Sequence, residues 1–177
     1  MKKFTILFYL LSLSFANSQS DKNVEENQVQ IGLPMPAVLY EKGIGKNATL
    51  SLEALTGLQI RGCSGCETQF GVHPILRGQY RYYYNMERRI RKGKNITGNS
   101  GNYVGGLLVY QSGAPLIGDI QNSDILGGGP VYGIQRTYKR GFFYRLEGGV
   151  AYLEDDFNKG IGLILAARIG WVLRKRR

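Results

Sequence analysis

Apolar and polar positions alternate most clearly between residues 69 and 84. Because successive side chains of a strand point to opposite faces, this run predicts a strand with one apolar face and one polar, cationic face. The apolar face carries Phe70, Val72, Pro74, Leu76, Gly78, Tyr80, Tyr82 and Tyr84, and the other carries Gln69, Gly71, His73, Ile75, Arg77, Gln79, Arg81 and Tyr83. The strand exceeds the usual length in soluble proteins. It fits a membrane-spanning barrel strand that ends in an aromatic girdle.

Strand-like runs separated by turn-rich stretches fill most of the chain, and no helical periodicity stands out. They cover roughly residues 28–41, 48–60, 69–84, 103–112, 126–138, 142–153 and 161–173. We therefore expect an all-β fold, an up-and-down antiparallel transmembrane β-barrel. Because bacterial single-chain barrels have even strand numbers, we expect eight strands, with the eighth from residues 21–31 and a turn at Pro34-Met35-Pro36.

The first segment has the pattern of a secretory signal peptide. Lys2 and Lys3 precede an apolar run from Phe4 to Phe15, and the small residues of Ala16-Asn17-Ser18 follow. This predicts a signal peptide at residues 1–18 and a β-barrel domain at residues 19–177. The rest of the chain has no apolar stretch of about 18 residues or more, so we expect it to cross no membrane as a helix. The expected location is the bacterial outer membrane.

The formal net charge of the chain is +10 at pH 7. A basic balance can indicate nucleic-acid binding, but for an exported protein we expect no nucleic acid. Membrane lipid or lipopolysaccharide is the expected partner. The loops are a second possible contact surface, for an unknown protein partner.

Charges of opposite sign are predicted at opposite ends of the barrel. If the strands run up and down, the turns at 42–47, 85–102 and 139–141 share an end with the basic C-terminal tail. The loops at 61–68, 113–125 and 154–160 share the other end and are acidic. The residues expected to contact lipid headgroups are Arg88, Arg89, Arg91, Lys92 and Lys94. The aromatic residues expected at the membrane interface are Tyr80, Tyr82, Tyr84, Tyr144 and Trp171.

Two charge pairs are predicted inside the barrel. A hairpin around residues 63–66 places Glu53 opposite Arg77, and a turn around Phe157 places Glu147 opposite Arg168. Opposed charges stabilise an antiparallel sheet. An eight-stranded barrel has just enough interior for side chains to fill, so we expect a filled interior and no open pore.

Cys63 and Cys66 are the most prominent candidates for chemistry. In an exported protein their spacing favours a local disulfide, with labile thiols or a metal or redox role as alternatives. His73 is the only histidine, and no serine or acid stands at a defined spacing from it, so we expect a polar interior residue and no general base. We expect no catalytic residue, no metal and no cofactor.

The segment from Tyr80 to Tyr103, an aromatic strand end that runs into a basic turn ending in Asn-Ser-Gly-Asn, resembles a pattern in small, mostly uncharacterised bacterial outer-membrane β-barrel proteins of the OmpA/OmpX-like type. The resemblance implies a barrel in the outer membrane, with no established activity and no catalytic residues. The expected function is a structural or surface-interaction role. The alternatives are a soluble lipocalin-like barrel that binds a small apolar ligand between inward apolar faces, and a lipid-modifying barrel enzyme that uses His73.

Overall fold

A computed structural model describes residues 22–62, 65 and 67–173 of the chain. The predicted signal peptide at residues 1–18 lies outside these residues, as do both cysteines of the predicted disulfide, Cys63 and Cys66, and the basic tail at 174–177.

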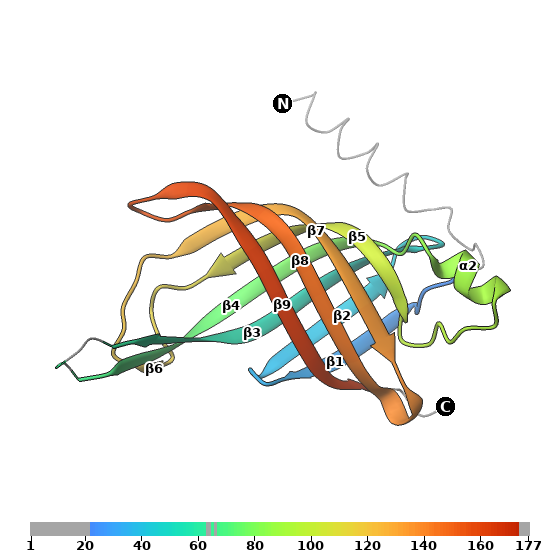
Figure 1. The fold of residues 1–177 in the computed structure, drawn as a ribbon, viewed down its shortest axis with the longest axis horizontal. Helices are drawn as coiled ribbons and strands as arrows, with labels where there is room; N and C mark the ends of the chain where they lie inside the picture. Colours follow the sequence, from blue (N-terminus) through green and yellow to red (C-terminus); the bar gives the residue numbers. More distant parts are fainter. Residues whose placement is uncertain (1–21, 63–64, 66, 174–177) are drawn as a thin grey trace, which may run out of the picture.

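Eight strands form an antiparallel sheet that closes into a ring (Figure 1). They are β1 (Asn27–Leu33), β2 (Ala37–Gly43), β3 (Ala48–Arg61), β4 (Gln69–Tyr82), β5 (Gly101–Gln111), β7 (Ile125–Thr137), β8 (Phe142–Glu154) and β9 (Lys159–Leu173). Each strand pairs with the next in this order, and β9 pairs with β1. The prediction of an all-β, up-and-down fold with eight strands is confirmed. Closure leaves none of these eight strands as a free edge along the ring.

The eighth strand arises because the run at 28–41 is two strands, β1 and β2, and not one. The turn between them lies at Pro34-Met35-Pro36, as predicted, and the closing pair is Gly32 with Ala37. Proline lacks the N–H that a strand ladder needs, so two prolines end β1 at this point.

Three short elements were not predicted. The helix α2 (Met86–Arg91) and the 3-10 turn η1 (Lys139–Gly141) lie in connections, and β6 (Ile117–Gly118) pairs with β4 beyond the last residue of β5. In α2 only Met86 is buried, which is too little apolar surface to produce a helical period in the sequence. Among the described residues, no helix has the length and apolar character needed to cross a membrane.

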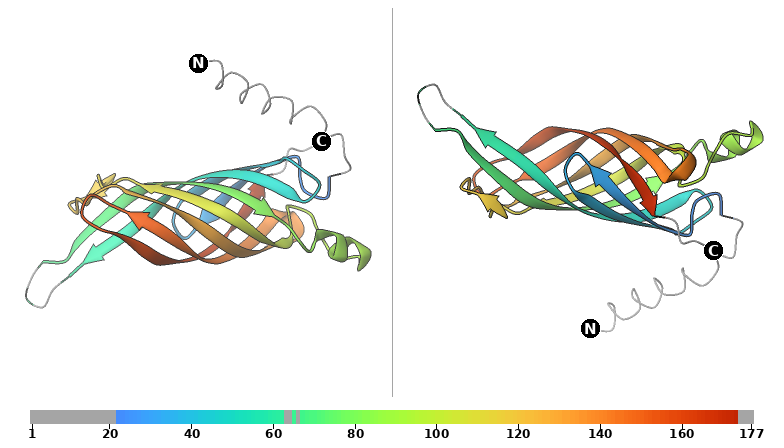
Figure 2. Two further views of the ribbon diagram at one scale, coloured as in Figure 1. Left: turned by 90° about the horizontal axis from the view of Figure 1, so that it is seen from above. Right: turned by 90° about the horizontal axis from the view of Figure 1, so that it is seen from below.

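The connections gather at two ends of the ring, as the strand order predicted. The connections at 44–47, 83–100 and 138–141 share one end, and those at 34–36, 112–124 and 155–158 share the other, where β3 ends and β4 begins. Figures 1 and 2 show α2 at the first end and the β3–β4 hairpin projecting beyond the ring at the second.

We call these the basic end and the acidic end. The basic end holds Lys42, Lys46, Arg88, Arg89, Arg91, Lys92, Lys94, Lys139 and Arg140, and the acidic end holds Glu67, Asp119, Asp124, Glu154, Asp155 and Asp156. The separation is incomplete, because Glu25, Glu26 and Glu87 lie at the basic end and Arg61 and Lys159 at the acidic end.

The two faces of the sheet differ in polarity, and the predicted faces of β4 are confirmed. Its inward residues His73, Arg77 and Arg81 are buried, whereas its outward residues Leu76 and Tyr82 are exposed. The largest buried side chains of the described residues include Arg81 and Arg145 along with Tyr83, Tyr103 and Phe143. The ring therefore turns charged side chains and a few aromatic ones inward, and it leaves most of its aliphatic and aromatic side chains outside.

Candidate functional site: the charged interior and the ends of the ring

Seven charged side chains of the described residues meet inside the ring. Three carboxylates come from β2, β3 and β8, and four guanidinium groups come from β4, β8 and β9. They are Glu41, Glu53 and Glu147, and Arg77, Arg81, Arg145 and Arg168. Strand alternation sends each of them inward. Four positive against three negative groups leave one formal positive charge in excess.

Glu147 receives hydrogen bonds from both sides of its carboxylate. Arg77 Nη2 donates to Oε2 at 2.8 Å, while Gln79 Nε2 and the Tyr103 hydroxyl donate to Oε1 at 3.0 and 2.5 Å. Arg81 Nη2 lies 3.6 Å from the same Oε1. Because Arg77 also donates to Glu53 Oε2 at 3.1 Å, it joins β3 and β4 to β8 across the ring.

The predicted pair of Glu53 and Arg77 is confirmed, since these residues lie opposite each other in the β3–β4 register and form an ion pair. The predicted pair of Glu147 and Arg168 is wrong. Glu147 faces Ala166 in the register, and Arg168 is 3.8 Å from Glu53.

The β8–β9 register differs because the turn is centred before Phe157. Asp155 Oδ1 accepts the N–H groups of Phe157 and Asn158 at 2.8 and 2.6 Å. This side-chain-stabilised turn makes Glu154 and Lys159 the closing pair. The strands are thereby shifted by two residues from the predicted register, and the faces are preserved.

Glu41 anchors the interior near the basic end. It accepts hydrogen bonds from Thr49 Oγ1 at 2.6 Å, from the Tyr83 hydroxyl at 2.9 Å and from Gln28 Nε2, and Arg81 Nη1 lies 3.6 Å away. Sequence reasoning missed this residue. The available signal was its place on the same face as Ala37 and Leu39 once residues 28–41 are divided into two strands.

Residues 95–100 lie across the basic end. The carbonyl oxygen of Gly98 accepts from Gln135 Nε2 at 2.8 Å, and Asn99 Oδ1 accepts the backbone N–H of Glu25 at 2.7 Å. Gly98 and Asn99 have left-handed φ values of 61° and 56°, which glycine and asparagine tolerate. The segment thus ties β7 to the residues before β1 and covers the interior there.

The acidic end is covered by the 112–124 connection. His73 is buried with its Nδ1 3.1 Å from the carbonyl oxygen of Ser112, and Asn122 Nδ2 lies 3.4 Å from its Nε2. Ile120 is also buried, where a Cβ on Gly71 would touch it. These contacts are those of a satisfied interior histidine. Among the described residues, no group of three or more histidine, cysteine or acidic side chains is placed to hold a metal ion.

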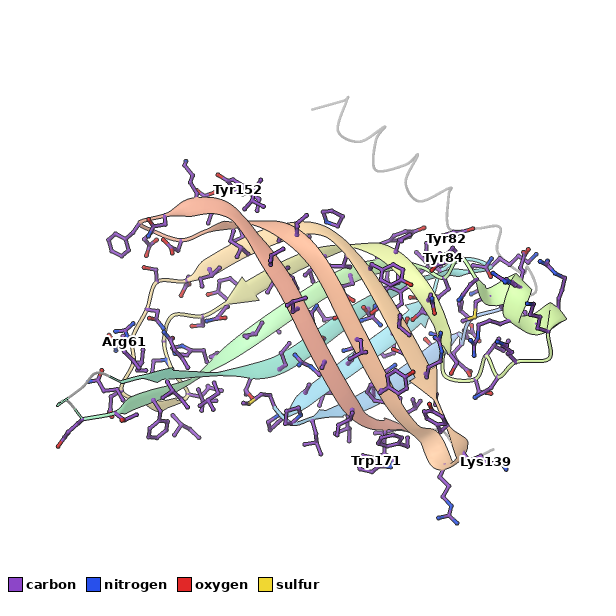
Figure 3. All side chains as sticks on the ribbon, viewed as in Figure 1. Arg61, Tyr82, Tyr84, Lys139, Tyr152 and Trp171 are labelled. Carbon is purple, nitrogen blue, oxygen red and sulfur yellow. The ribbon has the colours of Figure 1, made fainter. Side chains whose placement is uncertain are left out.

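Exposed aromatic rings surround the basic end on the outside of the ring. Figure 3 shows Tyr82, Tyr84 and Trp171 at this end. Tyr80 and these three side chains are exposed, whereas Tyr144 is half-buried with its ring 6.1 Å from that of Tyr138.

The predicted headgroup-contacting residues lie just beyond these rings. Arg88, Arg89, Lys92 and Lys94 line one pocket with Arg136, and Arg91 does not line it. Burial and the neighbouring Arg136 guanidinium lower the pKa of Arg89. On the other side of α2, a hydrogen bond from Lys46 lowers the pKa of Glu87, and the two side chains are 2.9 Å apart.

Comparison of the chain with protein-family models, with curated proteins and with solved structures found no match.

Proposed function

We propose that this protein is a bacterial outer-membrane β-barrel with a side-chain-filled interior and a structural or surface-interaction role. One observation carries the proposal: the ring buries ion pairs inside and exposes aliphatic side chains outside. A soluble protein buries its aliphatic residues, so this distribution suits a ring whose outer solvent is hydrocarbon.

The height of the apolar face supports this proposal. On β9 the outward residues from Ile161 to Leu173 are apolar, and Ile161, Leu163 and Leu165 are about four-fifths exposed. This stretch is about 40 Å long at ~3.4 Å per residue. At a tilt of about 45° it rises ~28 Å, close to the ~25 Å apolar band of such barrels. The apolar band is shorter over β1 and β2, which have seven residues each, and the bilayer would thin locally there.

The distribution of polarity also favours the membrane barrel over the soluble alternative. A lipocalin-like barrel needs an apolar interior for its ligand, whereas Glu41, Arg81 and Arg145 occupy the interior here. The lipid-modifying alternative needs a histidine that a substrate can reach. His73 is 1% exposed and lies under the 112–124 connection, so we assign it a structural role.

Fractionation of the producing cells tests the proposal. The expected result is a protein that stays in the outer-membrane pellet after carbonate extraction and migrates faster on a gel when it is not boiled, because a closed hydrogen-bonded ring resists detergent. A freely dissolved monomer with no heat-dependent mobility contradicts the proposal.

A further inference from the structure

A polar pocket opens on the outer side of the basic end, between α2 and the end of β7. Its volume is about 330 Å³. Of the described residues, five cationic side chains and no carboxylate line it. They are Arg88, Arg89, Lys92, Lys94 and Arg136.

Backbone and amide oxygens hold the two innermost guanidinium groups. Arg136 Nη1 donates to the carbonyl oxygens of Gly101 and Gln135 at 2.8 and 2.7 Å, and its Nη2 donates to Asn102 Oδ1 at 2.6 Å. Arg89 Nη2 donates to the carbonyl oxygen of Asn95 at 2.8 Å, and its Nε is buried with no hydrogen-bond partner among the described residues. Both groups are therefore held in place, and neither forms an ion pair with a carboxylate in the part of the chain that the structure describes.

The acidic residue nearest to Arg89 in the sequence does not neutralise these guanidinium groups. Glu87 forms its ion pair with Lys46, at 2.9 Å. Burial lowers the pKa of Arg89, and repulsion from the Arg136 guanidinium group lowers it further. An anion bound between them would relieve this repulsion and would receive charge-assisted hydrogen bonds.

Tyrosine hydroxyl groups lie on the side of the pocket that faces the apolar band. The hydroxyl groups of Tyr84 and Tyr132 are 3.2 Å apart, and Asn102 Nδ2 donates to Tyr132 at 3.0 Å. Exposed tyrosines of a membrane barrel lie at headgroup level. The pocket is thus at the depth where lipid phosphates would be, if the proposed function holds.

We propose that this pocket binds the phosphate group of a membrane lipid, with the acyl chains lying along the outer face below Tyr84 and Tyr132. The inference rests on the proposed membrane location. In the pocket, phosphate oxygens would contact guanidinium and ammonium groups. Free inorganic phosphate could make the same contacts.

The test compares two variants of equal charge in detergent micelles. In the pocket variant, Arg88→Gln, Lys92→Gln and Lys94→Gln remove three cations that line the pocket. In the control variant, Arg91→Gln, Lys139→Gln and Arg140→Gln remove three cations from the same end that do not line it. Native mass spectrometry then measures retention of added phosphatidylglycerol, of diacylglycerol and of inorganic phosphate. Heat-modifiable gel mobility, measured on every variant, reports separately whether the barrel forms.

We expect the wild type to retain phosphatidylglycerol and not diacylglycerol. The affinity of the pocket variant for phosphatidylglycerol should be lower than that of the wild type by a factor of about ten or more, and the affinity of the control variant should stay within about twofold of the wild type. Displacement of the lipid by inorganic phosphate supports a site that takes phosphate from either source, and retention supports a site that also needs the acyl chains. Equal losses in both variants, or equal binding of diacylglycerol, overturn the inference even when every variant keeps its heat-modifiable mobility. If the wild type shows no heat-modifiable mobility, the result contradicts the proposed function and not this inference alone.

Discussion

Replacement of Glu147 by glutamine removes one negative charge from the interior with little change in side-chain shape. The wild-type carboxylate accepts hydrogen bonds on both oxygens, from Arg77 on one and from Gln79 and Tyr103 on the other. A glutamine amide has one acceptor oxygen and one donor group. In either orientation its NH₂ group therefore faces donors that the carboxylate had satisfied.

The expected cost follows from these contacts. At least one charge-assisted hydrogen bond is lost, which contributes about 1.5–3 kcal/mol. Arg77 and Arg81 also lose a shared counter-charge at 2.8 and 3.6 Å. Removing one partner of a buried ion pair costs about 3–5 kcal/mol. We therefore expect Glu147→Gln to lower the free energy of unfolding by about 3–5 kcal/mol.

Urea unfolding of the refolded protein in micelles measures this change, with the emission of Trp171, the only tryptophan, as the signal. Glu154→Gln is the matched control, because Glu154 is exposed at the acidic end, and its effect should stay within about 0.5 kcal/mol. Adding Arg81→Gln to Glu147→Gln restores the excess of one interior positive charge, so the double variant should lose less stability than the sum of the single variants. A loss below about 1 kcal/mol for Glu147→Gln would refute the assigned network.

Three further predictions follow from other parts of the ring. Leu165→Arg on the outer face should cost about 2–4 kcal/mol of unfolding free energy in lipid vesicles. Phe157 in the β8–β9 turn is the control, because both residues are more than 80% exposed, and Phe157→Arg should cost under about 0.5 kcal/mol. Equal effects of the two substitutions would argue against lipid contact. Gly133→Ala should cost about 1–3 kcal/mol, because a Cβ there would lie 2.1 Å from Cζ of Tyr103, and Gly106→Ala, with open space around it, serves as the control in the same urea titration. Hydrogen bonds from Tyr110 and from the Gly113 N–H lower the pKa of Asp124. The ionised carboxylate therefore stabilises the 112–124 connection above the ordinary aspartate pKa, and this stabilisation is lost as the pH falls through the lowered pKa. Protease cleavage of this connection should rise on acidification in the wild type and be independent of pH in Asp124→Asn.

Alternation along single strands was enough to predict most of the fold. The inward and outward residues of β4 follow from the sequence because a two-residue period is local. The β3–β4 register, and with it the pairing of Glu53 and Arg77, follows from a hairpin with a nearly symmetric turn. The need for an even strand number correctly predicted a turn at Pro34-Met35-Pro36.

The features that were missed depend on contacts across the ring. The partner of Glu147 is Arg77, on a strand that is not its neighbour, and only closure of the ring brings them together. The side-chain contacts of Asp155 decide the β8–β9 register, and a count of residues around Phe157 does not reveal them. The role of Gly98 and Asn99 in covering the basic end likewise depends on Gln135 and Glu25, which lie far from them in the sequence.

The most direct test of lipid contact uses the native tryptophan. Trp171 is on the outer face near the basic end, with 49% of its surface exposed and its ring edge-on to Phe142 at 5.8 Å. In vesicles made with lipids brominated at defined depths along the acyl chain, we predict that Trp171 fluorescence is quenched, most strongly by bromines near the headgroup. Fluorescence that no brominated lipid quenches, from protein that does not float with the vesicles, would show that water covers the outer face of the ring.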